Sequence, residues 1–136
     1  MLRRDFLQAQ MQKLAQVLAR IIGLKKDGLP DEAQALLHHI LKDEFGIEPA
    51  DLQAPDPDQF LARIRAQAYG PEKTDLLSNF LYQAATPFRA DDPECKAILQ
   101  KVLALYDLLE TDFRWQSLEN LNRRTHIREF LAGGSV

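Results

Sequence analysis

Apolar residues recur at every third or fourth position along most of this chain, and prolines divide these recurrences into segments. A spacing of three and four places side chains on one face of an α-helix, whereas a strand would need alternate positions. Proline lacks an N–H, so it suits the first turn of a helix and is excluded from the interior. The pattern therefore predicts an all-α protein in which several helices begin at prolines.

The segments can be read off in order. A long first helix is predicted from about Arg3 to Lys26, with an apolar stripe along one face formed by Leu7, Met11, Leu14, Leu18 and Ile21. Five further starts are predicted at Pro30, Pro49, Pro57, Pro71 and Pro93. The stretch from Ile98 to Leu109 is apolar over the widest arc, which favours the most buried position for that helix.

This order predicts antiparallel helix pairs joined by short loops. We expect a tetratricopeptide-like short superhelix or an irregular bundle of about six helices, forming one domain over residues 1–136.

Charge and cysteine content limit the class of protein. The chain has 17 basic and 20 acidic residues, a net charge of −3. A nucleic-acid binder would normally carry a basic excess, so nucleic acid is an unlikely partner. The first residues lack the apolar run of a signal peptide, and no stretch is long enough to span a membrane. We therefore expect a cytoplasmic protein without membrane contact, and the single cysteine, Cys95, agrees with this.

Three N-terminal motifs resemble those of a bacterial protein family of unknown function. They read "MLRRDFL" from residue 1, "IIGLKK" from residue 21 and "GLPDEA" from residue 28, and the likeness covers roughly the first 46 residues. In the last motif the glycine and alanine are spaced as in the turn and second helix of a tetratricopeptide repeat. The resemblance implies a tetratricopeptide-like helical fold and brings no reaction with it.

His38 and His39 raise the question of a metal or acid–base site. The apolar positions of their segment fall on one helical face, and both histidines fall with Asp43 on the polar face. His39 and Asp43 are neighbours at i and i+4, so two ligands can meet there, but zinc needs three or four. We predict no metal site and no cofactor, and keep an enzyme or metal-binding domain using His38 and His39 as the alternative.

Two groups of residues are candidates for binding. Lys25 and Lys26 end the first helix, where they complement its dipole and could hold a peptide carboxylate. Near the C-terminus, a basic group lies close to aromatic residues and comprises Trp115, Arg123, Arg124 and Arg128. Guanidinium groups beside aromatic rings can receive a phosphate, an acidic peptide or RNA, so RNA or anion binding through residues 123–128 remains a second alternative.

No catalytic residues are predicted. Cys95 follows several carboxylates, which disfavour a reactive thiolate, and no phosphate-binding loop, nucleophile elbow or zinc-helix motif occurs. We therefore expect a non-catalytic interaction or scaffold domain with a protein or peptide partner. A homodimer is the nearest variant, closed either by the apolar arc between Ile98 and Leu109 or by Phe113 and Trp115.

Overall fold

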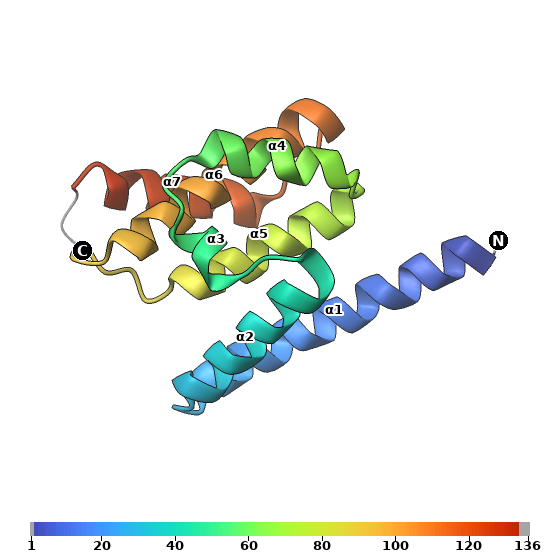
Figure 1. Cartoon of the computed structure of the whole chain (residues 1–136), viewed down its shortest axis with the longest axis horizontal. Helices are drawn as coiled ribbons and strands as arrows, with labels where there is room; N and C mark the ends of the chain where they lie inside the picture. The colour runs from blue at the N-terminus through green and yellow to red at the C-terminus, as the bar shows by residue number, and fades with distance from the viewer. Residues whose placement is uncertain (1, 134–136) are drawn as a thin grey trace.

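The computed structural model describes residues 2–133, and within this range the protein is all-α (Figure 1). The helices are α1 (Leu2–Lys26), α2 (Pro30–Phe45), α3 (Pro49–Gln53), α4 (Pro57–Gln67), α5 (Pro71–Ala85), α6 (Pro93–Phe113) and α7 (Leu118–Leu131). No strand occurs among these described residues, so the predicted fold class is confirmed.

The prolines begin helices as predicted, because each of α2 to α6 has its proline in the first turn. Aspartate side chains just before two of these prolines cap the N-terminus of the helix that follows. The Asp56 carboxylate accepts a hydrogen bond from the Asp58 N–H at 2.9 Å, and the Asp92 carboxylate accepts one from the Glu94 N–H at 3.0 Å. These bonds satisfy amides that have no partner inside their own helix.

Helix α6 lies at the centre of the fold, in contact with α3, α4, α5 and α7. Its apolar positions are buried on several sides, as its wide apolar arc predicts. They include Ile98, Leu99, Val102, Leu105, Leu108 and Leu109. The same burial corrects one variant of the homodimer prediction. The arc of α6 is covered by helices of its own chain, so it is not available to a second copy.

Helices α1 and α2 form an antiparallel hairpin that packs against α5 along one side of the other helices (Figure 1). Gly28 makes the turn with a φ of 76°, a conformation that glycine adopts without steric cost. Ala33 is fully buried, as a small residue at a close helix crossing should be. Because α1 is longer than α2, the N-terminal part of α1 projects beyond the hairpin (Figure 1).

Cationic side chains from one helix cap the carboxyl end of another at three places. Lys25 on α1 donates to carbonyl groups at the end of α5, and Lys101 on α6 donates to the Leu52 and Ala54 carbonyls at the end of α3. Arg63 on α4 donates to the Gly46 carbonyl at the end of α2. The last carbonyl groups of a helix lack intrahelical partners and carry partial negative charge, so these contacts satisfy them and join the helices together.

Candidate interaction surfaces

Lys25 is engaged inside the protein, whereas Lys26 beside it is exposed. The Lys25 ammonium donates to the Gln83 carbonyl, to the Thr86 carbonyl at 3.1 Å and to the Thr86 hydroxyl at 2.8 Å. Burial lowers the pKa of Lys25. An ammonium has three donors, and all three are used here. Lys25 could hold a peptide carboxylate only by giving up a contact between α1 and the end of α5.

A cleft of about 510 Å³ lies where the end of the α1–α2 hairpin meets the α5–α6 connection. Its apolar lining includes Leu37, Leu52 and Ile98, and its polar lining includes His38, Arg89 and Glu94. Lys25 and Cys95 also line it. The volume lies within the usual range for ligand pockets, but charged groups of both signs share the cleft, so it does not select a ligand of one charge.

The arginines of α7 make contacts across the fold. Arg123 donates to the Asn79 side-chain oxygen at 2.6 Å, lies 4.2 Å from the centre of the Tyr82 ring and pairs with Glu119 at 3.2 Å. Its side chain is only 18% exposed. These contacts hold α7 on α5 and leave little of the guanidinium for a ligand.

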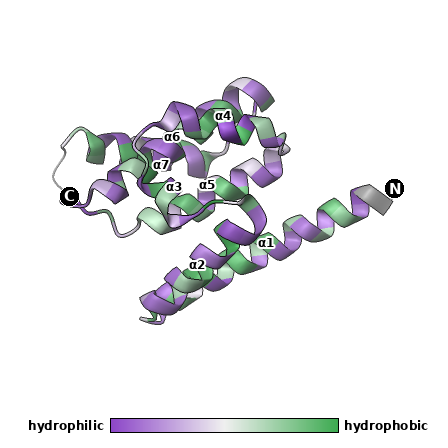
Figure 2. Ribbon diagram, in the orientation of Figure 1, coloured by the Kyte–Doolittle hydropathy of each residue, from purple (hydrophilic) through white to green (hydrophobic). Residues whose placement is uncertain are grey.

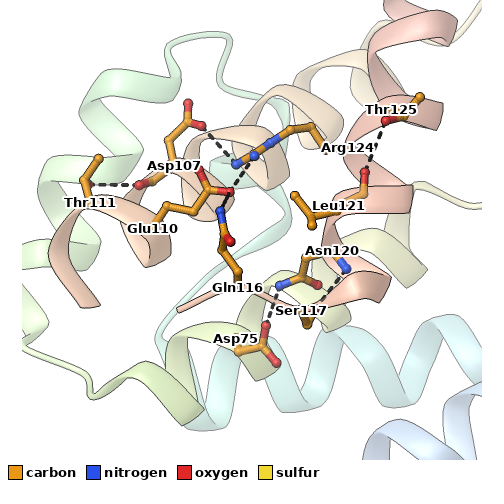
Figure 3. A network of polar contacts seen from close by, with 10 residues as sticks. All are labelled: Asp75, Asp107, Glu110, Thr111, Gln116, Ser117, Asn120, Leu121, Arg124 and Thr125. Atoms are coloured by element: carbon orange, nitrogen blue, oxygen red, sulfur yellow. Dashed lines mark hydrogen bonds and ion pairs between the residues drawn. The ribbon is translucent and has the colours of Figure 1, made fainter. Parts of the chain in front are cut away.

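Arg124 is held in the same way against α6 (Figure 3). It pairs with Glu110 at 2.6 Å and with Asp107 at 3.2 Å, and its side chain is 12% exposed. The hydrogen bond from Arg124 lowers the pKa of the Glu110 carboxyl. In Figure 3 Asn120 points toward Asp75, to which it donates at 2.8 Å. Ion pairs and hydrogen bonds therefore hold α7 against α5 and α6.

Of the predicted basic group, only Arg128 is exposed to solvent. Trp115 is partly buried against the core, and its position follows from the end of α6. Arg114 adopts a left-handed conformation with a φ of 52°, and the Trp115 N–H donates to the Leu109 carbonyl at 2.9 Å. This pairing is typical of helix ends, so the Trp115 backbone completes the end of α6.

The two histidines differ in their surroundings. His39 is exposed, whereas His38 is partly buried and lines the cleft, which corrects the prediction that both lie on a solvated face. Across residues 2–133, no three His, Cys, Asp or Glu side chains come close enough together to hold a metal ion.

Cys95 is buried near the start of α6, between the Ala85 carbonyl and the Arg89 N–H. Burial raises the pKa of its thiol, and the nearby Asp92 carboxylate raises it further. A thiol acts as a nucleophile in its ionised form, so this environment disfavours reactivity.

The projecting end of α1 exposes apolar side chains, and we call residues 2–10 the arm. Phe6 is 68% and Leu7 48% exposed, whereas Leu14 and Ile21 further along α1 are 1% and 0% exposed. Gln10 donates to Glu44 near the end of α2 at 3.1 Å, which marks where α2 stops covering α1. Figure 2 shows hydrophobic residues continuing along α1 into this projecting end.

The arm corrects the sequence interpretation. The helical spacing predicts that Leu7 and Leu14 share one apolar stripe, but the structure buries Leu14 and exposes Leu7. The lengths of the two helices explain the difference, because α1 has 25 residues and its partner α2 only 16. An antiparallel partner of that length cannot cover the whole stripe, since each residue adds only about 1.5 Å to a helix.

The predicted binding residues do not form one surface. Lys25 and Lys26 end α1 near the α5–α6 connection, while Arg123, Arg124 and Arg128 lie on α7. Within the part of the chain that the structure describes, none of the helices combines the length and the apolar sequence needed to cross a bilayer. Comparisons with protein-family models, with curated proteins and with solved structures find no significant match to this chain.

Proposed function

We propose that this protein is a non-catalytic interaction module of the cytoplasm, built from tetratricopeptide-like helix pairs, which binds another protein through the arm. The observation that carries the proposal is the exposure of Phe6 and Leu7 on a helix whose apolar stripe is buried further along, at Leu14 and Ile21. The exposed pair continues the face on which Leu14 and Ile21 are buried, and α1 packs on both α2 and α5. A second helix is therefore the natural occupant of that face.

Burial would supply the energy for binding. Moving a phenylalanine or leucine side chain from water into an apolar contact contributes about 1.5–3 kcal/mol. The arm is also preformed, because it continues a helix that is anchored from Gln10 onward. Binding therefore need not begin a new helix, which is the costly step for a short peptide.

The proposal can be tested by photo-crosslinking in cells that express the protein. Benzoylphenylalanine is placed at Phe6 in one variant and at Gln12, which is exposed on the opposite face of α1, in a control. We expect protein adducts from position 6 and none from position 12. Equal labelling from both positions, or no adduct from position 6, would count against the arm as the binding surface.

A further variant separates the arm from the arginine region. Arg128→Glu reverses the charge of the exposed arginine on α7 without breaking a contact inside the fold. We expect the adducts formed from position 6 to persist in this variant. If they disappear, the partner uses the α7 surface, as the alternative interpretation predicts.

A further inference from the structure

Basic residues lie on both sides of the apolar stripe of α1, with Arg4 inside the arm and Lys13 just beyond it. Residues seven positions apart project from an α-helix in nearly the same direction. Arg4 therefore lies on the same side of α1 as Met11, and Lys13 on the same side as Phe6. Both Arg4 and Lys13 are exposed. The apolar strip of Phe6, Leu7 and Met11 therefore has a cation at each edge. A complementary partner would be apolar in the middle and acidic at its edges.

The protein already contains one helix with this chemistry. Helix α2 packs on α1 and α5, and its buried apolar residues include Ala33, Leu37 and Ile40. It carries four acidic residues and one basic residue, a net charge of −3 with its histidines neutral. Helix α1 carries six basic residues and one acidic residue, a net charge of +5. In the fold, the stripe of α1 thus packs on an acidic amphipathic helix, and α2 ends opposite Gln10, the last residue of the arm (Figure 1).

The arm of a second copy lacks this complementarity. If two arms paired along their stripes, the cations at the edges of one would face the cations at the edges of the other. Like charges placed opposite each other between helices oppose association. The charge pattern that favours an acidic helix therefore disfavours pairing between two arms.

We propose that an acidic amphipathic helix of another protein docks along the arm, end to end with α2 and on the same face of α1. Phe6 and Leu7 bury against its apolar positions, and Arg4 pairs with its edge carboxylates, as does Lys13 where the docked helix meets the end of α2. This inference rests on the proposed function and specifies the chemistry of its partner.

The test uses two synthetic helical peptides as probes with the full chain. Both carry leucine at the first and fourth positions of each heptad, and the flanking positions are glutamate in one peptide and lysine in the other. Each peptide is labelled with fluorescein, and binding is followed by anisotropy. We expect one glutamate peptide to bind per chain, at least about tenfold more tightly than the lysine peptide, with affinity that falls as salt is added.

Matched variants locate the binding. Phe6→Ser with Leu7→Ser changes only exposed side chains, and Gln8→Ser with Gln12→Ser changes two exposed side chains on the other side of α1. We expect the first pair to weaken binding of the glutamate peptide by about tenfold or more and the second to leave it unchanged. Urea unfolding of both double variants serves as the control, and we expect each to fold like the parent chain.

Several outcomes would overturn the inference. These are equal or tighter binding of the lysine peptide, no binding of either peptide, or binding that survives Phe6→Ser with Leu7→Ser. Self-association would also overturn the inference, if sedimentation shows a dimer that Phe6→Ser with Leu7→Ser abolishes. So would membrane binding, if the chain co-sediments with vesicles of phosphatidylglycerol and phosphatidylcholine and the same double variant abolishes this. If the glutamate peptide fails while photo-adducts from position 6 persist, the proposed function stands and only the acidic helix is excluded.

Discussion

The ammonium groups of two lysines donate hydrogen bonds to backbone carbonyl groups of residues that are distant from them in sequence. Lys25 reaches the carboxyl end of α5, and Lys101, which is 1% exposed, reaches that of α3. Burial lowers the pKa of both ammonium groups. A buried charge is costly unless it is hydrogen-bonded, and the carbonyl groups at a helix end supply acceptors with partial negative charge. At this scale the cations act as connections between helices.

Replacing Lys25 tests this role directly. Lys25→Met keeps an unbranched side chain but removes the ammonium donor from the Thr86 carbonyl, and leaves the Gln83 carbonyl with the Thr86 hydroxyl alone. We expect the free energy of unfolding to fall by about 1–3 kcal/mol, measured in urea. Lys26→Met is the matched control, because Lys26 is exposed, and it should change stability by less than about 0.5 kcal/mol. Equal effects of the two substitutions would contradict the capping role.

Tyr106 predicts a dependence of stability on alkaline pH. Its hydroxyl is buried, and burial raises its pKa to about 12. In the unfolded chain a tyrosine titrates near about pH 10. Above that pH the unfolded state releases the proton first, so the stability present below about pH 10 is lost progressively toward about pH 12.

Tyr106→Phe removes this titration. In urea unfolding at about pH 11, the wild type should have lost about 1 kcal/mol more of its neutral-pH stability than the variant has. Other groups titrate alike in both proteins, so their contributions cancel in the comparison. A parallel decline of both proteins with pH would show that Tyr106 does not carry the effect.

At the scale of elements, α7 combines few apolar contacts with several polar ones. Its buried apolar residues are Ile127 and Phe130, while Asn120, Arg123 and Arg124 reach side chains on α5 and α6. Hydrogen bonds between partly buried charged groups contribute more than exposed ion pairs do. The attachment of α7 should therefore depend on its arginines.

Arg124→Leu tests the attachment of α7. The substitution removes the pairs with Asp107 and Glu110, and we expect the protection of α7 amides in hydrogen exchange to fall by about tenfold or more. Arg128→Leu, at an exposed position on the same helix, should leave that protection unchanged. Unaltered exchange in Arg124→Leu would mean that the apolar residues alone hold α7.

At the scale of the whole molecule, one apolar core includes buried residues of α1 and α2 as well as those around α6, and the α1–α2 hairpin contacts α5. The arm lies outside this packing, since its described apolar side chains remain exposed. The arm is therefore expected to contribute to binding and little to folding stability.

Deletion of residues 2–9 tests this separation. We expect the free energy of unfolding to change by less than about 0.5 kcal/mol, with a loss of helical circular dichroism. Leu14→Ala, in the buried part of the same stripe, should cost about 2–5 kcal/mol. A deletion as costly as Leu14→Ala would show that the arm belongs to the folded core.

The sequence alone determined the helical class, the starts of five helices and the central place of α6. Each of these depends on residues within a few positions of one another, such as Asp92 beside Pro93, or on the width of one apolar arc. Such local features act before any distant contact forms.

Only the tertiary structure decided which of the predicted surface groups are free. Lys25 meets partners 58 and 61 residues away, and Arg123 meets Asn79 at a separation of 44. Leu7 and Leu14 have the same place in the helical period, and they differ because α2 ends opposite the segment between them. Period and charge describe a residue on its own helix, whereas its exposure depends on the length and position of the helices packed against it.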